Sequence, residues 1–213
     1  MSPRLASLGR MTQTRGLRDG FDAGGLNTAL AEAVCLDADV DTAGARLVLH
    51  LGVPVLPENG DAPVERPLRL TFSGVSRIAA SLRVHAWGDA PPDVLPLTID
   101  GLARAIRSFG GGRLHGWEYI DVDDSGWALW RELLSFDTVV ADRVSAHVLE
   151  FSQEEGTNPR ELDVRVWFDD LTIHDRSGKQ IPLAEFIANG ARWWQAHDKG
   201  DPRTLEFEII PPL

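Results

Sequence analysis

Residues 68–72 alternate apolar and polar side chains, and so do residues 162–168 in the second half of the chain. A period of two is typical of a strand with one buried face. Each segment is followed by a short polar corner and then by more β-type residues, at 75–78 and 171–173. The recurrence predicts an α+β fold made of two related, mainly antiparallel β units, each with a packed helix, fused into one compact body.

The 213 residues are enough for one large or two small domains. Three consecutive glycines at 110–112 mark the expected boundary, with a first α+β unit at 26–109 and a second at 113–213. Residues 1–25 are expected to be a flexible N-terminal segment, because they contain several arginines and no apolar stretch of signal-peptide length. Translation could start at either methionine of that segment.

Apolar residues at helical spacing predict helices, and alternating or β-rich runs bounded by turn residues predict strands. The expected helices are 26–34 after a glycine pair, 99–106, a short one at 127–134, and 183–194 ending near residue 200. The expected strands are a hairpin over 36–51 with its turn at 42–44, 78–86, 117–122, 148–151 paired with 162–168, and 205–209. A turn is expected at 176–179, and the proline-rich stretch 54–67 is expected to be a connecting loop.

The net charge of −11 and the sequence pI near 4.9 disfavour nucleic acid or an anionic membrane as a partner, because phosphate groups require a basic face. No apolar run is long enough to cross a membrane. Cys35 is the single cysteine, which excludes an internal disulfide and favours a reducing, cytoplasmic compartment. Its apolar neighbours favour a core position. The dominance of arginine over lysine is typical of a GC-rich bacterial genome.

Residues 121–132 resemble the spacing of a calcium-binding loop. Asp121, Asp123 and Ser125 stand at its first, third and fifth positions, and Glu132 stands at its twelfth. The residues before this loop read as glycine-rich coil and strand instead of an incoming helix. The alternative is that an acidic residue or Ser125 caps a short helix. Calcium is the one cofactor that the sequence suggests.

Two sets of residues are candidates for a binding surface. Asp37, Asp39 and Asp41 alternate along a predicted strand, which places their carboxylates on one face. If the apolar residues of 162–168 face the core, Trp167 and Arg165 lie on the opposite face, where a helix or a partner must cover them. Trp193 lies beside the apolar stripe of the last helix. Core placement is the alternative for both tryptophans.

His174 and Asp169 belong to the one cluster of histidine and carboxylate side chains, and they are the weak candidates for an acid–base pair in a hydrolase. No nucleophile elbow, zinc-binding helix, phosphate-binding loop or dinucleotide fingerprint is present. The favoured hypothesis is therefore a non-enzymatic module that binds a basic protein partner, in the way that immunity-type proteins mask a basic enzyme. A calcium-binding domain and a hydrolase with a dispersed site are the alternatives.

Overall fold

The structure is a computed structural model that describes residues 22–56, 64–85, 91–111, 114–120, 130–155 and 160–205. Its strands form two antiparallel sheets. Sheet A has the order β1 (Val34–Asp41), β2 (Arg46–Val55), β3 (Val64–Ser73), β10 (Asp170–Asp175), β11 (Gln180–Ile181). Sheet B has the order β5 (Asp93–Val94), β4 (Arg77–Val84), β9 (Arg160–Phe168), β8 (His147–Glu154), β6 (Leu114–Ile120), and β7 (Phe136–Val139) also pairs with β4. The helices are α1 (Ala23–Leu30), η1 (Ile99–Gly101), α2 (Leu102–Ser108), η2 (Arg131–Leu133), α4 (Leu183–Asp198) and α5 (Pro202–Leu205).

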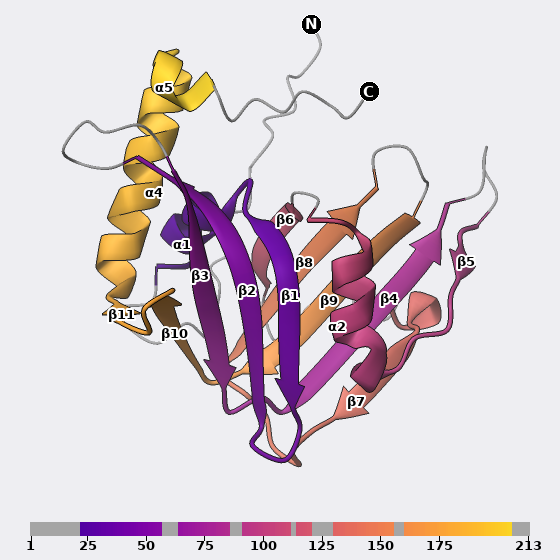
Figure 1. The fold of residues 1–213 in the computed structure, drawn as a ribbon. Helices are drawn as coiled ribbons and strands as arrows, with labels where there is room; N and C mark the ends of the chain where they lie inside the picture. Colours follow the sequence, from indigo (N-terminus) through magenta and orange to yellow (C-terminus); the bar gives the residue numbers. More distant parts are fainter. Residues whose placement is uncertain are drawn as a thin grey trace, which may run out of the picture.

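The two sheets are joined at one end because two strands bend from one sheet into the other (Figure 1). β3 continues into β4 and β9 continues into β10, while β3 pairs with β10 and β4 pairs with β9. Gly74 lies at the corner between β3 and β4 with a φ of 65°. A Cβ atom there would lie 2.5 Å from an oxygen of Asp169, which lies at the corner between β9 and β10. The absence of a side chain thus lets the two corners approach each other.

The hydrophobic core lies between the sheets, where the inward residues of both meet. Phe72 of β3 and Phe168 of β9 touch edge to face, with ring centroids 4.9 Å apart. α1 and α2 contribute buried leucines to the same core. Gly190 of α4 lies against Ala29 of α1 so closely that a Cβ would approach the Ala29 backbone to 2.5 Å. The bend, the core and the helices therefore form one packed unit over the described residues.

The α+β class and the antiparallel pairing are confirmed. Strands occupy both alternating segments, 68–72 and 162–168, and the predicted pairing of 148–151 with the latter is present. The hairpin of β1 and β2 turns at 42–44 as expected, and helices cover 99–106 and 183–194. Each of these segments has a clear hydrophobic period and an adjacent turn signal, which is why local pattern was sufficient.

Some local expectations were wrong. Pro54 belongs to β2, in a part of that strand that pairs with β3 but not with β1. Pro67 belongs to β3, in a part that pairs with β2 but not with β10. A proline is tolerated there because no ladder hydrogen bond is required on that side. α1 begins before the glycine pair, with the Asp22 side chain accepting a hydrogen bond from Gly25 N at 2.8 Å. Leu205, predicted to begin a strand, ends α5, and β7 was not predicted.

Strands of both halves of the sequence contribute to each sheet. In the first half, α1 is followed by three strands of sheet A, and then β4 crosses to sheet B. In the second half, β6, β7, β8 and β9 belong to sheet B, and then β10 crosses to sheet A and is followed by β11 and α4. α2 contacts β1, and α1 contacts β6. Among the described residues, no helix is long and apolar enough to span a membrane.

Candidate functional site

Outer face A is the name used here for the side chains of sheet A that alternate with its buried residues and point away from the core. They are Asp39, Asp41, Arg46, Val48, His50, Arg69, Thr71, Asp170, Thr172 and His174. All of them are exposed or half-exposed. The strand register places His50, Arg69 and His174 side by side across three strands. This face is therefore a continuous polar surface that an incoming molecule can reach.

The three predicted carboxylates of β1 lie at the edge of outer face A, and each has a basic neighbour. Asp37 accepts a hydrogen bond from Arg107 of α2 at 2.6 Å. Asp39 lies 2.8 Å from His50 Nε2 and is 71% exposed. The carboxylate of Asp41 lies 3.8 Å from Arg46. These contacts are solvent-exposed and weak, so the Asp39 and Asp41 carboxylates remain available to a partner.

A hollow of about 370 Å³ opens on the same face. Its lining comes from β1, β2, β3 and the turn after β10, and consists of Leu36, His50, Leu51, Pro67, Leu68, Arg69, Arg176, Ser177 and Gly178. A bulge in β1 between Cys35 and Asp37 turns Leu36 outward, where it is 43% exposed. The hollow thus combines two guanidinium groups with an apolar wall. Sequence reasoning missed it because its members come from four separate segments.

The other predicted surface residues lie elsewhere and are largely covered. The side chain of Arg165 is 5% exposed, donates to Glu150 at 2.7 Å and lies over the ring of Trp130 at 4.8 Å. Trp167 is half-buried beneath the guanidinium of Arg77. Trp193 is 2% exposed and stacks on His197 of its own helix. The structure therefore does not bring these three residues together with the carboxylates of β1.

Arg165 and Trp167 belong to outer face B, the side chains of sheet B that point away from the core. Its members on β4, β9 and β8 include Arg77, Ala79, Ser81, Arg83, Val148, Glu150, Ser152, Glu161, Asp163, Arg165 and Trp167. Two described residues contact this face: the Leu133 carbonyl accepts a hydrogen bond from Ser81 Oγ at 2.5 Å, and the Trp130 ring packs against the Arg165 guanidinium. β7 pairs with the edge of β4 within the sheet. Most side chains of outer face B on β4 and β9 are buried.

Arg83 is the centre of a buried ion cluster on outer face B. One of its terminal nitrogens lies 2.6 Å from Glu161 and 2.7 Å from Asp163. Burial raises the pKa of Asp163 to about 6, with the neighbouring carboxylates of Glu161 and Glu150 adding to the effect of burial and Arg83 opposing it. Burial acts in the same direction on Glu161, but hydrogen bonds from Arg83 and His85 outweigh it and lower the pKa of that carboxyl.

This cluster was not predicted from the sequence. Glu161 and Asp163 are spaced two apart, which is the signal of one strand face, but nothing in the sequence indicates that β4 supplies the neutralising arginine. The pair of carboxylates has the separated pKa values that acid–base enzymes use. However, one guanidinium binds both groups, which is also the arrangement of a structural ion cluster. None of the three hollows described for this chain is lined by these residues.

The two candidate catalytic residues lie at opposite ends of β10. Asp169 precedes the strand, forms an ion pair with Arg143 and accepts a hydrogen bond from Ala146 N at 3.1 Å. His174 follows five residues later, which corresponds to roughly 16 Å along an extended strand. Proton transfer requires direct or single-water contact. The structure therefore does not bring Asp169 and His174 together as an acid–base pair.

The predicted calcium loop falls mainly outside the described residues, which resume at 130. Of its proposed ligands only Glu132 is described, as an exposed residue of η2. Calcium binding by Asp121, Asp123 and Ser125 stays a prediction. Within the described parts of the chain, no three His, Cys, Asp or Glu side chains lie close enough to hold a metal ion.

Cys35 is buried in the core, as expected from its apolar neighbours. Burial raises the pKa of its thiol to about 12, and the nearby Asp37 charge acts in the same direction. A thiol of this kind is protonated at neutral pH and is a poor nucleophile.

Comparisons with protein-family models, with curated proteins and with solved structures gave no match to this chain.

Proposed function

We propose that this protein is a non-enzymatic binding module and that outer face A contacts a protein partner. The observation that carries the proposal is the exposure of this face across four of the five strands of sheet A, including the 71% exposed side chain of Asp39. A broad polar face with few buried charges is what transient protein–protein contacts use. The single buried cysteine fits action in a reducing compartment, and we propose the cytoplasm.

The charge of the chain supports a partner that is basic where it faces β1. The net charge is −11, and Asp39 and Asp41 project from β1 with only exposed partners. Long-range attraction of this kind accelerates association more than it increases the lifetime of a complex. Masking of a basic enzyme, in the manner of an immunity-type protein, is the concrete form of this proposal.

We also propose that the two halves of the chain are related units that arose by duplication. Support comes from the order of elements within 26–109 and 113–213: each unit has three strands of one sheet, then a strand that crosses into the other sheet, a short strand paired with it, and a helix, α2 or α4. α1 and β7 are the exceptions, since neither has a counterpart in the other unit. If each copy of a duplicated unit places one strand, β4 or β10, in the sheet of the other copy, the two sheets are held together by both exchanged strands.

The binding proposal is tested by reversing charge on outer face A. The variant Asp39→Lys with Asp41→Lys is compared with a matched control, Glu185→Lys with Asp198→Lys, which makes the same charge change on exposed positions of α4. Each tagged protein is used to capture partners from extracts of the source organism at low and physiological salt. Captured proteins that depend on outer face A are then purified and their affinities measured by calorimetry.

We expect the β1 variant to bind an identified partner at least about tenfold more weakly at low salt, whereas the control retains the affinity. The lower affinity of the β1 variant should result mainly from slower association with the partner. If both variants lose the partner equally, the attraction is a property of net charge and outer face A is not the contact surface. If neither loses it, the partner binds elsewhere and the proposal is wrong.

A further inference from the structure

We propose that the hollow on outer face A is a binding site for a small organic monocarboxylate, whose anionic head is held by Arg69 and Arg176 and whose short apolar body lies against Leu36 and Pro67. This site goes beyond the proposed protein contact, because it requires no macromolecular partner. The argument rests on the shape of the hollow, on the free donors inside it and on the charges around it.

The shape comes from two local irregularities of sheet A. On one side, the bulge in β1 lifts Leu36 out of the sheet. On the other side, the turn at 176–178 follows β10 and lies next to Pro67 of β3. Gly178 has a φ of 86°, and the position that a Cβ would take there is 3.7 Å from a terminal nitrogen of Arg69. The Arg69 guanidinium therefore lies against the turn and forms one wall of the hollow.

Most described arginines have a carboxylate partner, as expected in an acidic protein. The paired arginines are Arg46, Arg77, Arg83, Arg107, Arg143, Arg160, Arg165 and Arg203. By contrast, Arg69 and Arg176 form no ion pair with any residue that the structure describes. Each guanidinium carries five N–H donors in a planar fork that matches a carboxylate. Two such groups lining one hollow of about 370 Å³ point to an anionic ligand.

The surrounding charges favour a single negative charge on that ligand. The Asp39 carboxylate lies beside the hollow, 2.8 Å from Nε2 of its lining residue His50. The Asp175 carboxylate, next to Arg176, accepts hydrogen bonds from the backbone N–H groups of Ser177 and Lys179. These two anions reduce the positive potential of the arginines, so a dianion such as phosphate is disfavoured. The apolar wall adds a preference for a ligand with a hydrocarbon body.

The other two hollows lack this combination. The hollow of about 470 Å³ between α2 and residues 96–98 contains Arg104 as its one charged lining residue. The hollow of about 580 Å³ beside α4 and α5 is lined by the cations Arg192 and Lys199, but Arg192 donates a hydrogen bond to Asn189, and the carboxylate of Asp201 lies in the same lining. The site between β1 and the 176–178 turn is therefore distinguished, among the three, by two lining guanidinium groups that have no ion-pair partner among the described residues and by an exposed leucine in the same lining.

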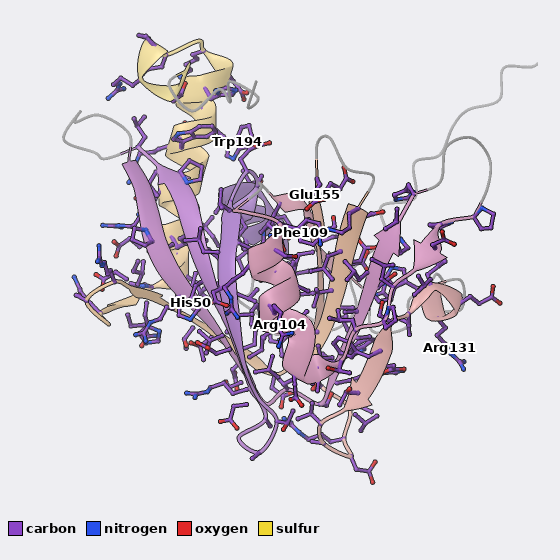
Figure 2. All side chains as sticks on the ribbon, turned by 45° about the vertical axis from the view of Figure 1, so that its right-hand side comes forward. His50, Arg104, Phe109, Arg131, Glu155 and Trp194 are labelled. Atoms are coloured by element: carbon purple, nitrogen blue, oxygen red, sulfur yellow. The ribbon has the colours of Figure 1, made fainter. Side chains whose placement is uncertain are left out.

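The test uses the full chain labelled with ¹⁵N and titrated with isovalerate, with the neutral amide isovaleramide, with acetate and with inorganic phosphate. Amide shifts are followed by NMR. The variant Arg69→Gln with Arg176→Gln removes both cations, and Leu36→Ala removes the apolar wall. The matched control is Arg104→Gln with Arg131→Gln, two exposed arginines that form no described ion pair, and Figure 2 shows Arg131 on the opposite side of the molecule from His50. Circular dichroism verifies that each variant is folded.

We expect isovalerate to shift the amides of residues 50–51, 69 and 176–178, with weaker effects from acetate and from phosphate. The Arg69 and Arg176 variant should bind isovalerate about tenfold more weakly or not at all, since two charge-assisted contacts are lost. The control should bind as the wild type does. Leu36→Ala should weaken isovalerate several-fold and leave acetate unchanged. Equal shifts with isovaleramide, tighter binding of phosphate, shifts centred elsewhere, or an unchanged affinity in the Arg69 and Arg176 variant would each overturn the proposal.

Discussion

Outer face A and outer face B have the same kind of sequence but different surroundings. On both faces, polar and charged residues alternate with core residues along the strands. On outer face A these side chains remain exposed or half-exposed, whereas Trp130 and Leu133 contact outer face B, where Arg83, Asp163 and Arg165 are buried. An alternating pattern thus specifies which side of a strand faces the core, but it does not specify whether the opposite side faces water.

The two faces also use charge differently. On outer face B, one nitrogen of Arg83 lies within 2.7 Å of both Glu161 and Asp163, and water is largely excluded. On outer face A, the Arg46 and Asp41 pair is 3.8 Å apart, with both side chains about half-exposed. Breaking a buried ion pair is strongly destabilising, because the remaining charge is not solvated by water. An exposed ion pair contributes little to the free energy of unfolding. Removal of one partner of the buried pairs on outer face B should therefore destabilise the fold, whereas substitution of the exposed charges on outer face A should cost little.

The largest expected effect is that of Arg83→Met. This substitution keeps much of the volume of the side chain and leaves two carboxylates on outer face B without their cation. We expect the free energy of unfolding at pH 7 to fall by about 3–5 kcal/mol. Urea denaturation followed by tryptophan fluorescence and by circular dichroism measures the change.

The loss in Arg83→Met should be smaller at pH 5, because the carboxyl groups then take up protons in place of the missing charge. A loss below about 1 kcal/mol at pH 7 would mean that outer face B is as well solvated as outer face A, and the distinction between the two faces would fail.

A second expectation concerns the pH dependence contributed by Asp163. Burial raises its pKa to about 6 from an ordinary value of 3.8, so the folded state binds this proton more tightly than the unfolded state. Its contribution to stability is full below the unfolded pKa and is lost as pH rises through about 6. Relative to Asp163→Asn, the wild type should therefore lose about 1 kcal/mol of unfolding free energy between pH 5 and pH 7.

Chemical denaturation of both proteins at pH 5, 6, 7 and 8 measures this difference for Asp163. The lowered pKa of Glu161 acts with the opposite sign and at lower pH, so measurements above pH 5 separate the two groups. If the two stability curves are parallel over this range, the Asp163 carboxyl is not desolvated in the folded state.

Local sequence was sufficient for elements whose side chains repeat with a clear period. The pairing of β8 with β9 and the helix α4 are examples, since each is defined by neighbours in sequence. The polar corner after residue 72 was predicted, but the crossing from one sheet to the other at Gly74 was not, because it depends on contact with the distant corner at Asp169. Long-range contacts of this kind decide whether a strand continues in its own sheet or crosses to another.

The candidate site was predicted only in part, for the same reason. Asp37, Asp39 and Asp41 were identified from their alternation, and their strand is where it was expected. The three lie on one face, because the bulge in β1 precedes Asp37 and the register is regular from Asp37 to Asp41. Arg69 and Arg176 carry no motif, and they come together only because β3 pairs with β10. The contact of Arg165 with Trp130 was not predictable, because no local pattern supplies the position of Trp130 relative to β9.

The smallest expected effect is on outer face A and tests the other side of the comparison. Arg46→Met removes one member of an exposed pair whose atoms are 3.8 Å apart, so the free energy of unfolding should change by no more than about 0.5 kcal/mol at pH 7. The same denaturation assay used for Arg83→Met measures it. A loss comparable with that of Arg83→Met would show that outer face A is under the same structural constraint as outer face B. Its charges would then be needed for folding, and the main physical reason for assigning recognition to that face would be removed.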